Sequence, residues 1–481
     1  MAVGGGDGSR TDGDGGAIAP PRLSRCAVRF NELVRVRTRV GKIVWRICTT
    51  LIAIVAGVLA CGVAYAEGPT APPQPSQPWL LGNWGGFRTH LLEKGVDFQI
   101  TYVSEVGYNP VGGAKSLATY TDQVSVGATL DLEKLITLPN SLLQITYTER
   151  AGRNLVEDAG LDTLQLVQEV YGRGQTVRLT QFYLEHRFFN DLINLRWGRS
   201  AMGDSFAVFS CDFQNLTFCG SQPGNLVGNY IYNWPISQWG ARVRVAIDGF
   251  GYVQAGAYDQ NEQYLGFENK LWPVWYSGST GVLLPFELAW LPTFDNGRLP
   301  GSYKIGAWYS TSALNDLILD VNGNLAALTG DPAMQRRGLY GGYLTFQQQV
   351  TRNSSSDPNA GLKLFLNAAV ADGETSATSF QVAAGLLYTG TFSSRPHDSI
   401  GFAIGTTQVN HRLTDLQNLQ NAMGLGPVPV RNSEYVMELF YTIAPVPGLL
   451  IRPNVQYIAT PGATSQNANI FVLGLKSVIS F

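Results

Sequence analysis

Residues 471–481 read FVLGLKSVISF and end the chain on an apolar alternation. One face of this stretch, taken as an extended strand, carries Phe471, Leu473, Leu475, Ile479 and Phe481. The other face carries Gly474, Lys476 and Ser480. A period of two is the period of a β-strand, and it predicts one apolar side and one wet side. Because a soluble domain usually ends in a frayed polar tail, the apolar side is expected to face a protein core or lipid.

The composition favours many half-apolar strands. Only 15% of the 481 residues are charged, and the chain holds 54 Gly, 21 Tyr, 22 Phe and 10 Trp. Mean hydropathy is near zero. Ordinary soluble domains are about 25% charged. After residue 66 the sequence contains no apolar run of helix length, and short alternating segments recur instead.

The first 66 residues are predicted to leave the mature protein. Residues 47–66 are apolar, follow several basic residues and end in Ala64-Tyr65-Ala66, which is typical of a signal peptide cleaved near Ala66. A transmembrane anchor is the alternative, since about 20 apolar residues can span a bilayer. Residues 1–34 fit no leader and are interpreted as an N-terminal extension. We expect residues 67–95 to form a linker and a short periplasmic helix.

Cleavage changes the charge and the cysteine count. Residues 67–481 hold 25 Lys and Arg against 32 Asp and Glu, a net charge of about −7, which argues against nucleic acid as a partner. Cys26, Cys48 and Cys61 belong to the removed part. Cys211 and Cys219 remain, and two nearby cysteines in an oxidising compartment indicate a disulfide.

Alternation recurs through the rest of the chain. Examples are LLQITYT (142–148), FYLEHRFFNDLINLRWG (182–198), WGARVRVAIDGFGYV (239–253) and SEYVMELFYTIAPVPGLLIRPNVQYIA (433–459). A β-sandwich would also alternate, and a propeller should show a repeat of about 40–50 residues, which we do not find. Apolar faces bracketed by aromatics, alternately short and long turns, and charges on the second face favour an all-β fold, a transmembrane antiparallel β-barrel over residues 96–481.

Such a barrel must close, because an open sheet edge cannot be satisfied in lipid. The last strand is therefore expected to pair with the first, for which KGVDFQITYVSEVGY (94–108) is the candidate. A terminal Phe481 on the closing strand is also the usual signal for the outer-membrane assembly machinery. The predicted partners are thus outer-membrane lipids and that machinery.

Four blocks together resemble the carbohydrate-selective porin (OprB) family. They are WLLGNWGGFRTHLLEKGVDF (79–98), LTQFYLEHRFFNDLINLRWGRS (179–200), SCDFQNLTFCGSQPGN (210–225) and WPISQWGARVRV (234–245). The resemblance implies a monomeric porin of 16 strands in the outer membrane of a Gram-negative bacterium. It also implies passive diffusion of glucose and related mono- and oligosaccharides through a constriction lined by arginines and acidic residues.

We expect the sugar site where the loop around Cys211 and Cys219 enters the lumen. Guanidinium groups can pair with vicinal hydroxyls, and aromatic rings can stack on a sugar. The candidate residues are Arg150, Arg178, Arg196, Arg242, Arg244, Trp239, Glu149, Asp212 and Asn215. Arg178 has the lipid-facing parity and can belong to the site only if a bulge intervenes or if it lies above the membrane. Trp239 also has the lipid-facing parity of its strand. Each of the arginines taken alone is also compatible with a solvated charge at the rim.

Other functions are weighed against the sugar channel. A general or anion-preferring diffusion porin would use the same arginines. An outer-membrane enzyme is disfavoured, because the four histidines (90, 186, 397 and 411) form no His-Glu-x-x-His motif and no Gly-x-Ser-x-Gly elbow occurs. We therefore expect no enzymatic activity, no cofactor and no metal.

Overall fold

The computed structural model describes residues 79–266, 277–354 and 357–481. The predicted leader and extension (1–66) and most of the predicted linker lie outside the described residues. Among the described residues, no helix is long and apolar enough to cross a bilayer.

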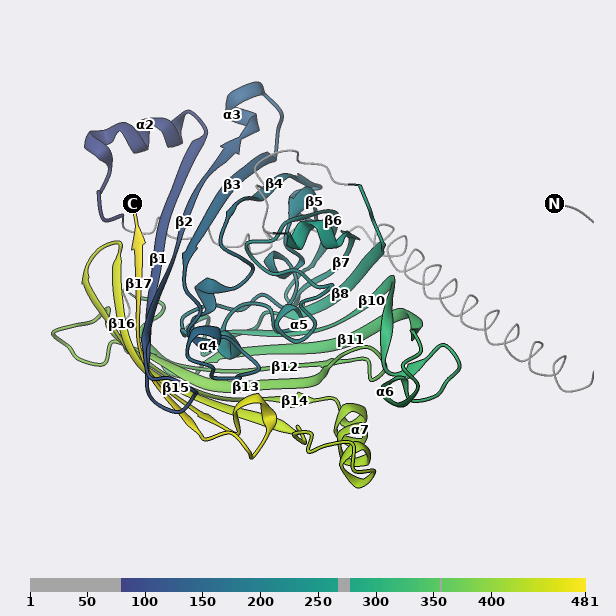
Figure 1. Ribbon diagram of the computed structural model, residues 1–481. Coiled ribbons are helices and arrows are strands. Elements are labelled where there is room, and N and C mark those ends of the chain that lie inside the picture. The colour runs from purple at the N-terminus through teal and green to yellow at the C-terminus, as the bar shows by residue number, and fades with distance from the viewer. Residues whose placement is uncertain (1–78, 267–276, 355–356) are drawn as a thin grey trace, which may run out of the picture. The chain divides into compact units, whose positions relative to one another are not determined.

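One antiparallel sheet forms the molecule and closes on itself (Figure 1). Its wall has 16 strands, and β9 (Thr293–Phe294) is a two-residue addition beside β10. The wall strands are β1 (Val96–Val111), β2 (Ala118–Asp131), β3 (Ser141–Gly152), β4 (Val177–Phe188), β5 (Ile193–Ser200), β6 (Gln238–Ile247), β7 (Gly251–Gln260), β8 (Gly281–Trp290), β10 (Leu299–Asp320), β11 (Ala333–Gln349), β12 (Gly361–Ala371), β13 (Thr378–Thr389), β14 (Ser399–Val409), β15 (Ser433–Val446), β16 (Leu449–Ala459) and β17 (Ile470–Ser480).

The last strand closes the barrel against the first, as predicted. β1 pairs with β17 in a register that sets Glu105 opposite Lys476 and Thr101 opposite Ser480. β1 pairs with β2 on its other side, so both of its edges are satisfied. A closed barrel leaves no open edge to lipid, which makes the fold compatible with a membrane.

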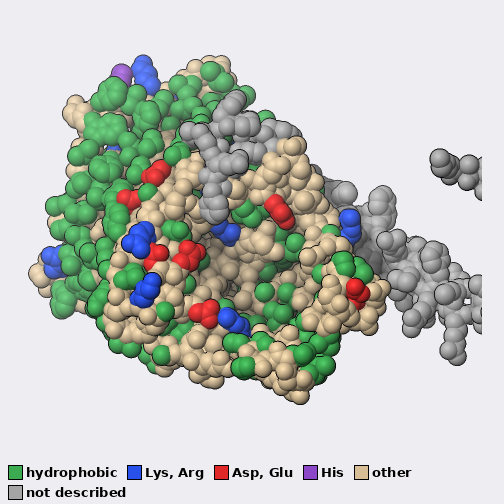
Figure 2. Space-filling view, in the orientation of Figure 1, with side chains coloured by type: hydrophobic (Ala, Val, Ile, Leu, Met, Phe, Trp, Pro, Cys, Tyr) green, Lys and Arg blue, Asp and Glu red, His purple; other side chains and the backbone are tan. Residues whose placement is uncertain are grey.

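The two faces of the wall follow the predicted parity. On β17, Leu473 is 42% exposed on the outer face, whereas Lys476 on the inner face is 2% exposed. Figure 2 shows hydrophobic side chains covering the outer wall on the visible side. The chain thus ends on an apolar strand because that strand's outer side faces lipid.

The shortest connections, between β4 and β5, β6 and β7, and β15 and β16, all lie at one end of the barrel. The turn between β4 and β5 is tight, with Asn190 and Asp191 both at positive φ, 52° and 66°. β15 and β16 are joined by two residues only. Because outer-membrane barrels place their short turns in the periplasm, the end that carries these turns and the C-terminus of β17 is the periplasmic one.

Short helices occupy the connections and the start of the described chain. They are η1 (Trp84–Gly86), α2 (Phe87–Glu93), α3 (Leu132–Ile136), α4 (Leu155–Asp158), η2 (Glu169–Tyr171), η3 (Met202–Asp204), η4 (Leu216–Phe218), α5 (Gln222–Leu226), η5 (Glu262–Leu265), α6 (Ala326–Thr329), α7 (His411–Ala422) and η6 (Pro461–Ala463). Where the sequence suggested a periplasmic helix, η1 and α2 precede β1.

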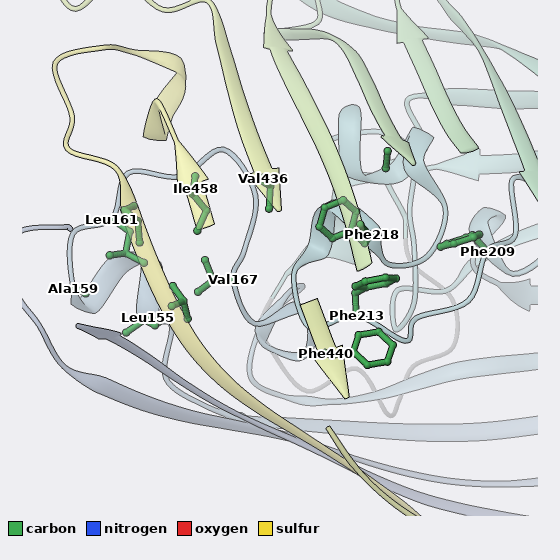
Figure 3. Packing of buried hydrophobic residues seen from close by; sticks show 14 of the residues in the cluster. Leu155, Ala159, Leu161, Val167, Phe209, Phe213, Phe218, Val436, Phe440 and Ile458 are labelled. Carbon is green, nitrogen blue, oxygen red and sulfur yellow. The ribbon is translucent and has the colours of Figure 1, made fainter. Parts of the chain in front are cut away.

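Two long connections pack inside the barrel. Residues 153–176, between β3 and β4, and residues 201–237, between β5 and β6, share an apolar cluster with inward-facing wall side chains (Figure 3). The cluster contains Leu155, Phe213 and Phe218 together with Val436 and Phe440 of β15, and the ring centres of Phe213 and Phe440 lie 4.9 Å apart. A second cluster joins Phe206 and other residues of the 201–237 connection to β7, β8, β10, β11 and β12. The inner wall is therefore partly apolar, which the expectation of a wet inner face did not include.

Candidate functional site in the lumen

Residues 204–214, which we call the inserted segment, run along the inner wall from β4 towards β17. At the start, Gln181 of β4 donates to Asp204 at 3.0 Å and Gln254 of β7 donates to the carbonyl oxygen of Ser205 at 2.7 Å. Further on, Lys304 of β10 donates to the carbonyl oxygen of Val208 at 3.1 Å. At the far end, Lys476 of β17 donates to the carbonyl oxygen of Phe213 at 2.9 Å. The segment is thus held by wall strands on many sides.

Wall carboxylates accept the backbone N–H groups of the inserted loops. Glu287 of β8 accepts from Ala207 at 2.8 Å. The two oxygens of Glu438 on β15 accept from Gln214 and Asn215, each at 2.8 Å. In the 153–176 connection, Glu434 accepts from Leu164 at 2.9 Å and Glu105 from Val170 at 3.1 Å. Hydrogen bonds to a charged acceptor are stronger than neutral ones, so these glutamates fix the loop backbones.

The disulfide joins Cys211 and Cys219 within the 201–237 connection, with their Cα atoms 4.2 Å apart. The residues it encloses are anchored to the wall. Asn215 is 1% exposed and donates its amide to Gln456 of β16 at 2.9 Å. Lys476, close to Cys211, bridges Glu105 at 3.2 Å and Glu169 at 2.9 Å. The Cys211–Cys219 disulfide therefore closes a loop that contacts the closing strands β1, β16 and β17.

Three predicted arginines form a cluster on β5 and β6. Arg196 lies opposite Arg242 in the strand pairing, and Arg244 lies opposite Asn194. Arg196 donates its Nε and Nη2 atoms to Glu185 at 3.0 and 2.8 Å. Arg242 approaches the same carboxylate at 3.6 Å and donates to the side chain of Asn194 at 2.6 Å. One carboxylate thus serves two guanidinium groups.

Tyrosine rings orient two of these arginines. The guanidinium carbon of Arg196 lies 4.2 Å from the ring centre of Tyr183. Arg244 lies in the same way 4.1 Å from Tyr252. Stacking on an aromatic face holds a guanidinium plane in one orientation. Arg196 keeps 18% of its side chain accessible, so its remaining donors can meet a solute.

Asp212 of the inserted segment faces Arg452 of β16. Their Oδ1 and Nη2 atoms are 3.0 Å apart, and Asp212 is 29% accessible. Burial alone would raise the pKa of Asp212, but Arg452, a hydrogen bond from Ser210, and the charges of Lys476 and Lys363 together hold the pKa below its ordinary value. Figure 2 shows a hollow in this view with acidic and basic side chains around it.

Two of the predicted arginines hold loops in place. Arg150, 4% exposed, donates to the carbonyl oxygen of Gly172 at 2.5 Å and to Gln123 at 2.8 Å. Arg178, 2% exposed, donates to the carbonyl oxygens of Tyr264, Arg173 and Gly266 at 2.9–3.0 Å. The required bulge is present, because Thr180 of β4 is skipped in the pairing with β3. Arg178 therefore faces inward, but its described contacts are with backbone.

Three other candidates lie apart from the arginine cluster. Glu149 is paired with Val124 and has the outward parity of Tyr147, so it lies on the outer side of the wall. Trp239 keeps the outward parity and packs against Tyr232, Ile236 and Tyr264. Asn215 is buried in the loop anchor described above. The structure therefore places none of these three side chains beside the arginine cluster.

Sequence reasoning missed Glu185, Lys304 and the loop-binding role of the wall glutamates. The available signal was parity, because Glu185 alternates with the outward-facing Leu184 and His186 on β4. Parity places a side chain inside, but it cannot tell a solute contact from a loop contact. Among the described residues, one group of potential metal ligands occurs, Glu169 with Cys211 and Cys219, and the two cysteines are already bonded to each other.

Comparison with known proteins agrees with the porin barrel. The model of the family described as "Carbohydrate-selective porin, OprB family" matches residues 115–481. Porin B of Pseudomonas aeruginosa is 41% identical over 430 residues, which cover 87% of this chain and 94% of that protein. The putative porin QuiX of Acinetobacter baylyi is 32% identical over 422 residues, covering 84% and 93%.

Solved structures give the same result. The high-pH structure of Pseudomonas putida OprB has a TM-score of 0.80 at 40% identity and covers 87% of this chain and 100% of that one. The low-pH structure of the same protein has a TM-score of 0.54 at 31% identity, with 84% and 100% covered. These relatives are channels, in agreement with the expectation of no enzymatic activity. The chain belongs to the OprB family of carbohydrate-selective porins and is a sugar-selective channel of the Gram-negative outer membrane.

Proposed function

We propose that sugars are selected at Arg196 and Arg244 together with Asp212 of the inserted segment, and that Arg242, which is 3% exposed, supports them by holding Glu185 and Asn194 in place. The observation that carries this proposal is the geometry of Arg196. Its guanidinium is stacked on Tyr183, paired with Glu185, and still partly accessible. A donor group fixed in this way can pair with two neighbouring sugar hydroxyls at little entropic cost.

Binding at such a site should be weak. A diffusion channel must release its solute as easily as it takes it up, so millimolar affinity, about −4 kcal/mol, is expected. Glu185 supports weak binding, because it already occupies part of the donor capacity of Arg196 and Arg242. We further propose that the inserted segment narrows the lumen and that the Cys211–Cys219 disulfide stiffens it.

An anion-preferring or general channel remains the competing proposal, and the local charge gives it a specific basis. Arg196 and Arg242 share Glu185 as their salt-bridge partner, whereas Arg244 donates to the neutral side chain of Gln254 at 3.0 Å and has no salt bridge among the described residues. A local excess of positive charge attracts anions. Such a channel would pass a sugar acid faster than the neutral sugar of equal size.

Liposome swelling separates these alternatives. Purified wild-type protein is compared with Arg196→Lys, which keeps the charge and loses the planar fork, for glucose, gluconate and a neutral amino acid. We expect glucose flux to fall in the variant while gluconate flux changes little. Arg298→Lys, in an exposed turn where Arg298 pairs with Asp295, is the matched control. Equal fluxes of all solutes through both proteins would contradict sugar selection at Arg196.

Assembly is also proposed on the basis of the sequence. We infer that the leader is cleaved near Ala66, that Phe481 is read by the outer-membrane assembly machinery, and that the barrel acts as a monomer. N-terminal sequencing of the protein isolated from outer membranes tests the cleavage. Light scattering in detergent tests the oligomeric state. Deletion of Phe481 should lower the amount of heat-modifiable protein, and an unchanged amount would contradict its role as a signal.

A further inference from the structure

The periplasmic end of the barrel exposes apolar side chains on two neighbouring short helices. Six large apolar residues of this region are at least 39% exposed: Leu81, Phe87, Leu92, Leu135, Ile136 and Leu138. The most exposed of these residues on α3 is Ile136, at 64%, and on α2 it is Phe87, at 56%. We call these six residues the apolar platform. Single exposed apolar residues are normal on a protein surface, but a group of this size needs an explanation.

The orientation of α2 is fixed by Arg88. This side chain is 3% exposed and donates to the carbonyl oxygens of Phe481 at 2.6 Å and Phe98 at 2.5 Å. Its guanidinium carbon lies over two indole rings, 3.6 Å from the ring centre of Trp79 and 4.7 Å from that of Trp84. The clamp joins α2 to both strands of the closing seam. The apolar side chains of α2 are therefore held outward by a built contact.

α3 is attached to the same place. Asp131 caps α3 by accepting from the N–H groups of Glu133 and Lys134 at 3.1 and 3.3 Å. Its own N–H donates to the carbonyl oxygen of Gly95 at 2.8 Å, and Lys134 donates to that of Leu92 at 3.3 Å. The two helices thus form one surface next to the ends of β1 and β2.

The platform continues the lipid-facing surface of the wall. Val96 pairs with Leu130, and Leu130 pairs with Leu143, which makes an outward row at the end of β1, β2 and β3. α3 follows β2 directly, and only Lys94 and Gly95 separate α2 from β1. Figure 2 shows hydrophobic side chains running from the outer wall onto the end where Figure 1 places α2 and α3.

We propose that the apolar platform lies in the periplasmic leaflet, against phospholipid at the boundary of head groups and acyl chains. Continuity with the lipid-facing wall is the argument for lipid as its occupant. The exposed side chains of His90, Lys94 and Lys134 border the platform and can reach the head groups while their stems stay on apolar surface. The platform thus gives the barrel an additional membrane contact beside the β1–β17 pairing that closes it.

Fluorescence quenching in phospholipid vesicles tests this proposal. Cysteine replaces Phe87 or Ile136 in the full chain, and each variant is labelled with an environment-sensitive dye. The parent chain, taken through the same labelling, gives the background from other cysteines. Asp248→Cys, in the exposed β6–β7 turn at the same end of the barrel, is the matched control. Heat-modifiable migration and glucose swelling verify that each labelled barrel is intact.

We expect a nitroxide attached to the lipid head group to quench the dyes at 87 and 136. Iodide in the buffer should quench them severalfold less than the dye at 248. Equal iodide quenching at all three positions would overturn the proposal. Protection that rises with protein concentration would assign the platform to a second copy, and protection only with periplasmic extract would assign it to a soluble partner; both results would also overturn it. These quenching results do not depend on which solute the channel selects.

Discussion

Glu438→Gln should loosen the inserted segment without disturbing the wall. In the structure both oxygens of Glu438 accept backbone N–H groups, from Gln214 and Asn215. The glutamine amide can accept one of these bonds through its oxygen, but its NH₂ group then faces the other donor. Loss of charge assistance at one bond and a stranded N–H at the other together cost about 3 kcal/mol. The open population of the segment should therefore rise by about two orders of magnitude.

Hydrogen exchange followed by mass spectrometry measures this opening directly. The peptide containing residues 214 and 215 should exchange about 100-fold faster in the variant, since exchange of a loop amide follows its opening equilibrium. In planar bilayers the variant should show more open-channel noise. Glu149→Gln is the matched control, because Glu149 lies on the outer side of β3 and serves neither inserted loop in the described contacts.

Exchange within about twofold of the wild type would refute the reasoning, since a 3 kcal/mol loss cannot give so small a change. It would mean that the apolar contacts of Phe213 and Phe218 hold the segment without the carboxylate. A uniform rise in exchange over β14, β15 and β16 would also contradict the prediction. That result would place the effect of Glu438 in the wall and not in the loop.

Three further changes have defined outcomes. Replacing Cys211 and Cys219 by serine should cost the loop roughly 2–3 kcal/mol and alter single-channel conductance; an unchanged conductance would place the bridge outside the narrow part. Arg178→Ala leaves three carbonyl groups without this donor, so the free energy of unfolding should fall by about 2–4 kcal/mol. The measurement is the temperature at which the folded band disappears in detergent gels, which should be lower in the variant. A wild-type temperature would show that the contacts with residues 173, 264 and 266 are dispensable. The pKa of Asp212 is lowered by Arg452, Ser210 and nearby lysines acting together against burial, so the stabilisation from its charge is present above the unfolded value of about 3.9 and is lost only as pH falls through the lower folded value. The conductance ratio of Asp212→Asn to wild type should then stay constant from pH 5 to 8, and a ratio that varies there would show that Asp212 titrates in that range.

The strand faces were predictable because parity is a local property of the chain. FVLGLKSVISF contains both the lipid side and the lumen side of β17, and the pairing with β1 follows from closure. The bulge at Thr180 was not predictable, since a skipped residue leaves no mark in the alternation of β4. Only a conditional statement was available, that Arg178 points inward if a bulge exists or if it lies above the membrane.

The site was less predictable because inward-facing polar residues do two different jobs. Arg196 is partly accessible, whereas Arg150 and Arg178 are buried against loop carbonyls. All three have the same chemistry and lie on inner faces of neighbouring strands. What separates them is the course of the 153–176 and 201–237 connections, which is set by contacts far away in sequence. The same holds for apolar residues: Phe440 and Val436 lie inside the barrel, and only the course of those connections explains why.

The apolar inner wall limits how this protein could be re-engineered. A wider channel is commonly sought by shortening the loop that fills it. Here such a deletion would uncover Phe365, Phe440 and Val472, which now lie beneath Phe209, Phe213 and the 153–176 connection. The widened channel would have an exposed hydrophobic strip along one side, which would favour dewetting and the binding of detergent or other amphiphiles. Enlargement would therefore need polar replacements on the strands as well as a shorter loop. The wall and the loops together determine how wide this channel can be.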